Sequence, residues 1–196
     1  MTFPDVVPRR EWLAARGELR DKEKHLARQR EALNDERQTL PMWKVEETPF
    51  FEGPDGPLRL RDLFAGRRQL IVYHFWFEPG AAPCDGCSLW TDDLGDLGGD
   101  FANLHRHDTS LAFVSRASQA EIASVKGQHG WNMPWFTVAD ETFNKVTGYE
   151  GWAQLSIFVH DGEHSHLANI VPMEDLTAIG NHWTLLERCP FGLAGS

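Results

Sequence analysis

The stretch QLIVYHFWFEPGAAPCDGCSLW, residues 69–90, decides the fold class that the sequence predicts. Its first nine residues are apolar on both faces and rich in branched and aromatic side chains, which is typical of a central parallel strand. Cys84 and Cys87 follow this strand, and a helix is expected from about Ser88. In an open α/β sheet, a reactive group lies where a central strand ends and the next helix begins. The two cysteines stand at that point.

The spacing of the two cysteines suits thiol-disulfide exchange. The free amides and the dipole of a helix N-terminus stabilise a thiolate, and a second cysteine one turn later can resolve a mixed disulfide. Cys84 is therefore predicted to be the nucleophile and Cys87 the resolving cysteine. Asp85 works against this assignment, because a neighbouring carboxylate disfavours a thiolate.

Two other uses of the pair stay open, namely half of a metal site and two small buried residues. Zinc would need two more ligands. The histidine-rich segment HDGEHSH, residues 160–166, is the best source of them, whereas Cys189 is expected to be a free thiol. A two-residue turn at Asp161-Gly162 would place His160 on the opposite face from His164 and His166.

Aromatic residues accompany the cysteine motif. Trp76 and Trp90 flank it in the sequence, and together with Trp135 they are predicted to shape a substrate groove. His74, inside the predicted central strand, is expected to be a hydrogen-bonded core residue and not a ligand.

The length, net charge, longest apolar run and cysteine count narrow the class of protein. The chain has 196 residues and a formal net charge of −10, which suits one core and argues against nucleic acid or an anionic membrane as partner. Its longest apolar run, residues 70–77, is too short to span a bilayer. Three cysteines do not make a disulfide scaffold. We expect a soluble, cytoplasmic protein.

Residues 9–40 differ from the rest of the chain. They are dense in charge and lie between Pro8 and Pro41, which predicts one long helix. A narrow apolar stripe recurs every seven residues along it, at Trp12, Leu19, Leu26, Leu33 and Leu40. We expect an N-terminal helical arm, residues 1–41, that lies on its own domain or is exchanged in a homodimer.

Residues 42–196 are predicted to form the globular domain. Short apolar runs alternate with helical segments in the order β-α-β-α-β-(α)-β-β-α. Ser118 and Glu121 have capping-box spacing, Gly148 is expected to stop a short helix, and a closing helix is predicted over residues 173–187. The expected strands lie near residues 58–60, 69–77, 109–116 and 135–140, and a hairpin over residues 155–171 is expected to turn at Asp161-Gly162.

Most of the chain resembles one family, the thioredoxin-like predicted dithiol-disulfide oxidoreductases of domain-of-unknown-function family 899, which are related to peroxiredoxins. The matching segments are REWLAAR, KEKHLARQREALNDERQTLPM, FEGPDGP, LFAGRRQLIVYHFWF, CDGCS, LAFVSRA, GWNMPWF and LSIFVHDG. The resemblance implies a thioredoxin-like three-layer α/β/α sandwich with a helical arm, and thiol-disulfide exchange at Cys84 and Cys87. A family histidine carries over to His166.

The sequence departs from the family pattern beside the expected active site. Ala153 and Gln154 stand where relatives have Pro-Gly, and the resemblance assigns Ala153 to the substrate groove. A non-proline cis bond costs about 3 kcal/mol, so a trans bond is expected at Ala153. The Pro and Thr or Ser that precede a peroxidatic cysteine are missing, because Ala81 stands three residues before Cys84. Peroxidase activity is therefore the weaker enzymatic prediction.

The predicted function is thiol-disulfide oxidoreduction without a cofactor, acting on a protein or small-molecule disulfide. The alternative is a non-enzymatic thioredoxin-like protein that binds zinc, another thiophilic metal or a ligand. The residues for that alternative are Cys84, Cys87 and His166.

Overall fold

The computed structural model describes residues 5–46, 48–95 and 101–172. The predicted closing helix and Cys189 lie outside these ranges. The chain divides into two units, residues 1–37 and residues 38–196.

The predicted long helix, α1, spans Arg9–Gln38 and makes up most of the first unit. Pro8 ends the preceding segment, and its carbonyl accepts a hydrogen bond from the backbone N–H of Trp12 at 3.1 Å. Exposed ion pairs, such as Arg16 with Glu23 at 3.0 Å, decorate the helix. Within the described residues, no helix combines the length and the apolar character that crossing a membrane requires.

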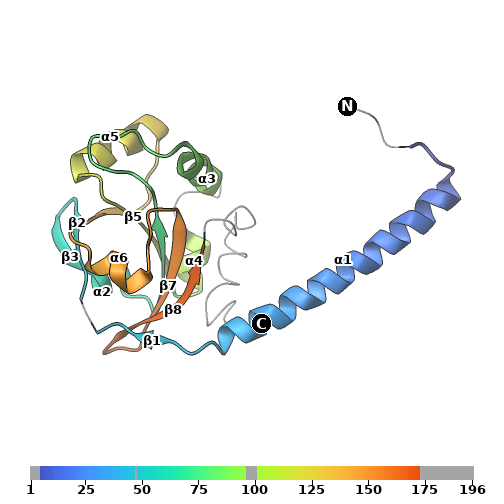
Figure 1. The fold of residues 1–196 in the computed structure, drawn as a ribbon, viewed down its shortest axis with the longest axis horizontal. Helices are drawn as coiled ribbons and strands as arrows, with labels where there is room; N and C mark the ends of the chain where they lie inside the picture. The colour runs from blue at the N-terminus through green and yellow to red at the C-terminus, as the bar shows by residue number, and fades with distance from the viewer. Residues whose placement is uncertain (1–4, 47, 96–100, 173–196) are drawn as a thin grey trace. The chain divides into compact units, whose positions relative to one another are not determined.

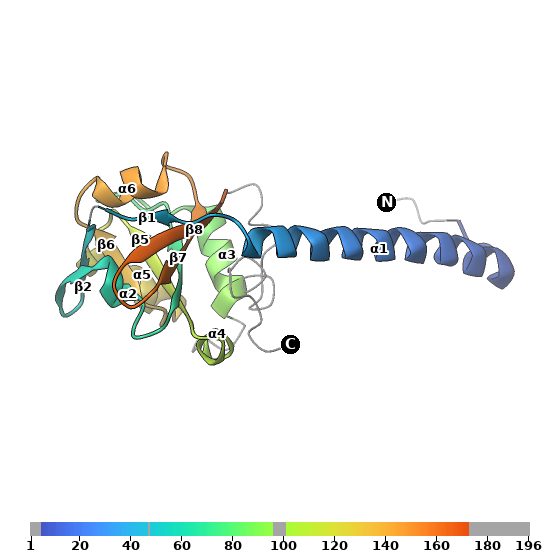
Figure 2. The ribbon, with the colours of Figure 1, turned by 90° about the horizontal axis from the view of Figure 1, so that it is seen from below.

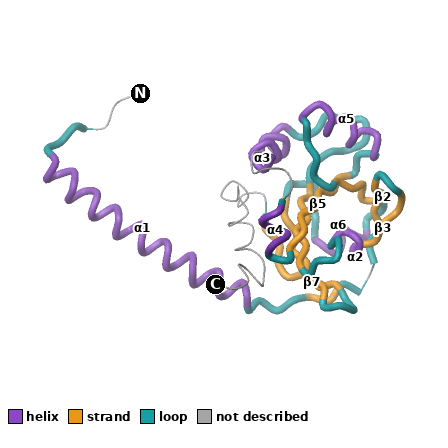
Figure 3. The backbone as a smooth tube through the Cα atoms, turned by 180° about the vertical axis from the view of Figure 1, so that it is seen from behind, coloured by secondary structure: helices purple, strands orange, loops and turns teal. Residues whose placement is uncertain are grey.

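The second unit is built on a mixed sheet (Figures 1 and 3). Its strands run in the spatial order β1-β8-β7-β4-β5-β6-β2-β3. The strands are β1 Trp43–Lys44, β2 Phe50–Gly53, β3 Gly56–Arg59, β4 Gln69–His74, β5 Thr109–Ser115, β6 Trp135–Val138, β7 Gln154–His160 and β8 Ser165–Val171. The helices are α2 Leu60–Leu63, α3 Asp85–Gly95, α4 Ala102–Arg106, α5 Gln119–His129 and α6 Thr142–Thr147.

The strand order around β4 settles the fold class. β4 pairs with β5 in parallel and with β7 in antiparallel orientation, and β8 continues the sheet antiparallel to β7. Figure 2 shows β1 beside β8 at one edge. A parallel β-α-β unit followed by an antiparallel hairpin, in the order β8-β7-β4-β5, is the thioredoxin-like arrangement. The predicted thioredoxin-like fold with a long N-terminal helix is therefore confirmed.

Helices cover both faces of the sheet. Along β4, Ile71 and Tyr73 join one buried cluster with residues of α3, α4 and α5. Leu70 and Val72 point the other way, into a cluster with residues of α2 and α6. This alternation follows from the two-residue period of a strand, and it explains why every residue of β4 is buried.

The predicted capping box and the predicted helix stop are both present in the structure. The Ser118 hydroxyl accepts the N–H of Glu121 while the Glu121 carboxylate accepts the N–H of Ser118, which starts α5. Gly148 ends α6 with a φ of 62°, a left-handed conformation that costs glycine little.

Several elements differ from the prediction. The segment FEGPDG, expected to be only a turn, forms the β2–β3 hairpin, with Phe50 opposite Arg59. α3 begins at Asp85, not near Ser88, because the loop turns into the helix directly after Cys84. The expected two-residue turn at Asp161-Gly162 has four residues, since His160 pairs with Ser165 and the Asp161 N–H bonds the His164 carbonyl at 3.1 Å.

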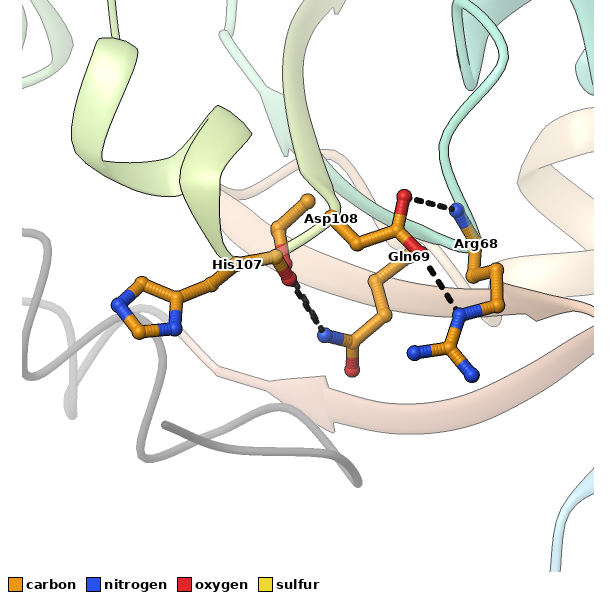
Figure 4. A network of polar contacts seen from close by, with 5 residues as sticks. Arg68, Gln69, His107 and Asp108 are labelled. Atoms are coloured by element: carbon orange, nitrogen blue, oxygen red, sulfur yellow. Dashed lines mark hydrogen bonds and ion pairs between the residues drawn. The ribbon is translucent and has the colours of Figure 1, made fainter. Parts of the chain in front are cut away.

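A polar network ties together the amino ends of the two parallel strands β4 and β5 (Figure 4). The Asp108 carboxylate accepts hydrogen bonds from the Arg68 backbone N–H at 3.2 Å and from Arg68 Nε at 2.7 Å. The buried Gln69 amide donates to Thr109 Oγ1 at 3.0 Å. These contacts hold the register at the end of β4 that lies opposite the cysteines.

Candidate active site

Cys84 lies in the loop after β4, directly before the first residue of α3. Its backbone N–H donates to the Trp76 carbonyl at 3.2 Å, and its own carbonyl accepts the Ser88 N–H at 2.9 Å, as at a helix N-cap. The Cys84 sulfur accepts the backbone N–H of Cys87 at 3.3 Å. An N–H donor and the positive end of a helix dipole both favour a thiolate over a thiol.

Cys87 has different surroundings from Cys84, although both are free thiols. It is 3% exposed and belongs to the buried cluster, whereas Cys84 is half-buried and packs against that cluster. Burial raises the pKa of the Cys87 thiol to about 11, even though hydrogen bonds from the Tyr73 hydroxyl and the Trp76 backbone lower it. Cys87 is therefore a neutral thiol at neutral pH.

Tyr73 is a site residue that the sequence reasoning missed. It is 1% exposed and belongs to the same buried cluster as Cys87. Its ring packs 4.3 Å from the ring of Trp90. Burial raises its pKa, as do the nearby sulfurs, so the hydroxyl stays protonated and can donate to Cys87. The only sequence signal that could have identified Tyr73 was the two-residue alternation of side chains along β4.

His74, the next residue of β4, is a core residue as predicted. Its ring stacks between Phe143 at 5.1 Å and Tyr149 at 4.7 Å, and its Nε2 lies 3.0 Å from Ser156 Oγ. Burial lowers the pKa of His74 to about 3, so the imidazole is neutral. Tyr149 completes this stack, and burial raises its pKa, with further contributions from Cys87, Glu78 and Cys84.

The predicted groove residues separate into surface and core. Trp76 is exposed and Trp90 half-buried, so both can line an approach to Cys84. Trp135 is 2% exposed and its indole N–H donates to Ser115 Oγ at 3.0 Å. Its placement in the groove needs correction, because β6 lies inside the sheet and turns this ring into the core.

Ala153 lies directly before β7, at the position where the family pattern has proline. It is 6% exposed and belongs to the same buried cluster as Cys87. None of the described peptide bonds is cis, which agrees with the trans bond expected at Ala153. The residue before it, Trp152, was missed, because it stands in a loop without a periodic pattern.

Trp152 is 63% exposed and its ring lies 5.9 Å from that of Trp76. The pairing of His74 with Gln154 explains this contact, because continuing the antiparallel register by two residues brings Trp76 opposite Trp152.

Charged residues border the same region. Arg116 lies 3.4 Å from Glu78 and also pairs with Glu141. Asp85 and Glu150 are exposed. Acidic side chains therefore outnumber basic ones among these residues.

The structure does not bring His166 to the cysteines. It pairs with Val159, which stands opposite Gln69 at the start of β4, whereas the cysteines follow the end of that strand. The start and the end of β4 are five residues apart along the strand, which corresponds to about 16 Å. Among the described residues, no group of three or more His, Cys, Asp and Glu side chains is placed to hold a metal ion.

Several solved structures are similar to the chain at low identity. A putative thiol:disulfide interchange protein DsbE from Chlorobium tepidum has 12% identity and a TM-score of 0.49, over 76% of this chain and 98% of that one. Peroxidoxin BcpB from Mycobacterium tuberculosis has 18% identity and a TM-score of 0.47, over 71% of this chain and 99% of that one. Identity at this level says nothing of a shared activity.

No curated protein sequence matches the chain. A family model does match, over residues 1–192, and its description is "Bacterial protein of unknown function (DUF899)". Because the match spans almost the whole chain, this protein belongs to the DUF899 family.

Proposed function

We propose that the protein is a dithiol-disulfide oxidoreductase. The observation that carries the proposal is the contrast between the two sulfurs. Cys84 is half-buried at the start of α3 with an N–H aimed at its sulfur, whereas Cys87 is buried and protonated one turn later. An accessible thiolate and a protected thiol are what attack and resolution require.

The reaction proceeds in two exchanges. The Cys84 thiolate attacks one sulfur of the substrate disulfide, a mixed disulfide forms, and the other substrate sulfur leaves as a thiolate that takes up a proton. Cys87 then loses its proton and attacks the Cys84 sulfur, which releases the second substrate thiol. Two electrons pass to the substrate, and the protein is left with a Cys84–Cys87 disulfide. An external dithiol must reduce this disulfide before the next turnover.

A redox titration tests the proposal. Protein with Cys189→Ser, which removes the third thiol, is equilibrated across a dithiothreitol series, its free thiols are alkylated, and its intact mass is read. We expect two thiols to disappear together at one midpoint, and Cys87→Ser to abolish this transition. Two thiols that stay alkylatable throughout would contradict the proposal, and thiols protected until a chelator is added would support the metal-binding alternative.

Peroxide and a disulfide can be compared in the same assay. The reduced pair should be oxidised faster by a disulfide than by hydrogen peroxide, because the residues around Cys84 lack the peroxidatic pattern.

A further inference from the structure

The two exposed tryptophans beside the cysteines point to a substrate class. Trp76 and Trp152 are 44% and 63% exposed and contact each other at 5.9 Å. Single exposed apolar side chains are ordinary on protein surfaces, but paired exposed aromatic rings next to a reactive group are typical of binding surfaces.

The position of Trp76 relative to the reactive sulfur is fixed by its backbone. Its carbonyl accepts the Cys84 N–H at 3.2 Å, and its N–H donates to the Cys87 sulfur. A side chain that packs on the Trp76 ring is therefore held close to Cys84. Rigid aromatic rings provide such contact area at low cost in side-chain entropy.

Trp152 is held from both sides in the chain. Gly151 before it has a φ of 94°, and Ala153 after it is anchored in the core. The register between β4 and β7 then sets the Trp152 ring against the ring of Trp76. The pair forms a surface that exists before any substrate arrives.

The charges around the site select against anions. Asp85 is adjacent to Cys84, Glu78 is close enough to act on Tyr149 beside the sulfurs, and Arg116 is engaged by Glu78 and Glu141. An anionic disulfide would meet Asp85 and Glu78, and the Arg116 guanidinium is already paired with two carboxylates. Like charges in close contact are unfavourable.

We infer that Trp76 and Trp152 dock an apolar side chain next to a disulfide in a polypeptide, and that the acidic border disfavours anionic small disulfides. The inference rests on the proposed function, because it names the substrate for exchange at Cys84. The substrate class is then a neutral or basic polypeptide disulfide with an apolar neighbour.

Single-turnover oxidation of the reduced protein, with Cys189→Ser, tests the inference. Two cyclic disulfide peptides are used that differ only in phenylalanine or serine next to one cysteine. We expect the phenylalanine peptide to react roughly tenfold faster, the amount that one buried aromatic contact of about 1.4 kcal/mol supplies. Trp76→Ala and Trp152→Ala should each reduce this ratio of rates from about 10 to a value between about 1 and 3.

Matched variants separate docking from folding. Trp152→Phe keeps an aromatic ring and should keep most of the ratio. Trp43→Ala removes an exposed tryptophan on β1, away from the cysteines, and should leave it unchanged. A ratio that stays at the wild-type value in Trp152→Ala would overturn the docking role.

Two small disulfides complete the design, uncharged hydroxyethyl disulfide and anionic glutathione disulfide. Hydroxyethyl disulfide should oxidise Trp43→Ala as fast as the wild type. With the wild type, glutathione disulfide should be slower than hydroxyethyl disulfide at low salt and gain rate as salt is added. Glutathione disulfide that reacts as fast as hydroxyethyl disulfide at low salt would overturn the charge selection. Failure of every disulfide, hydroxyethyl disulfide included, would overturn the proposed function itself.

Discussion

At the scale of single residues, Tyr73 is the side chain that most directly influences the chemistry of Cys87. In the proposed exchange, the Cys87 thiol has to lose a proton before it can resolve the mixed disulfide, and burial opposes this loss. The Tyr73 hydroxyl favours the thiolate by donating a hydrogen bond to its sulfur. The Trp76 backbone N–H helps in the same way, but among the described side chains Tyr73 is the one that offsets burial of Cys87.

Tyr73→Phe should therefore slow the resolving step. Loss of a hydrogen bond to a charged sulfur raises the pKa of Cys87 by about one unit, which cuts its thiolate fraction about tenfold. The thiolate that remains is about threefold more nucleophilic, so the net loss at pH 7 is about threefold. Rapid-quench measurement of product release from the mixed disulfide should show this loss and a pH profile displaced upward.

Tyr149→Phe is the matched control for this test. It removes a half-buried hydroxyl near the sulfurs, one that interacts with them through space and not by a hydrogen bond. Its resolving step should stay within about twofold of wild type. Identical pH profiles for Tyr73→Phe and wild type would contradict the role given to Tyr73.

His74 makes stability depend on pH. Its pKa is lowered by burial to about 3 in the folded protein, so the unfolded chain binds the proton more readily. This contribution to stability is complete above pH 6.5 and is lost as the pH falls below that value, by about 1.4 kcal/mol per unit. Between pH 6.5 and pH 5 the loss is about 2 kcal/mol.

Urea unfolding at the two pH values measures this loss. His74→Gln is less stable at both, because it loses the stacked ring, but its difference between pH 6.5 and pH 5 should shrink by about 2 kcal/mol. An equal pH dependence in the variant and in the wild type would show that another group titrates.

At the scale of elements, the contact between β4 and β5 depends on Asp108. Its carboxylate accepts both Arg68 hydrogen bonds, and its φ of 54° is left-handed. Asparagine tolerates that conformation and can still accept the backbone N–H, whereas alanine does neither well.

We expect Asp108→Ala to lower the free energy of unfolding by about 1 kcal/mol, and Asp108→Asn by less than half of that. Both groups are partly exposed, so solvent screening keeps the ion pair itself weak. Denaturant unfolding gives the two values. Thiol reactivity should not change, since the network lies at the far end of β4, and an altered alkylation rate of Cys84 would contradict this separation.

At the scale of the whole molecule, α1 carries a stripe that a single helix leaves uncovered. Trp12, Leu19, Leu26 and Leu33 recur at seven-residue spacing, and isolated helices are marginal in water without a packed face. Leu19→Glu with Leu26→Glu should therefore lower the melting temperature, whether the arm covers its own domain or a second copy. Light scattering separates the two cases, because the double substitution lowers the molar mass only if the arm is exchanged in a homodimer.

Ala14→Glu with Arg28→Gln changes the charge equally on the other side of α1 and is the control. It should keep both the melting temperature and the molar mass. A double leucine variant that behaves like this control would show that the stripe is not packed.

Much of this architecture follows from local sequence signals. The apolar run at β4, the capping box at Ser118 and the stop at Gly148 act within one element, so a reader of the sequence can find them. The β2–β3 hairpin was missed, because its strands are short and its stability comes from pairing with β6.

The sequence by itself determined the cysteine pair as the candidate site, the order of the main elements and the long charged helix, because spacing, periodicity and capping are local properties. Only the tertiary structure decided that Trp152 meets Trp76, that Tyr73 meets Cys87 and that His166 lies at the other end of the sheet. These contacts depend on which strands pair and in which register. Pairing between distant segments is set by the packing of the whole core, and no single stretch of sequence records it.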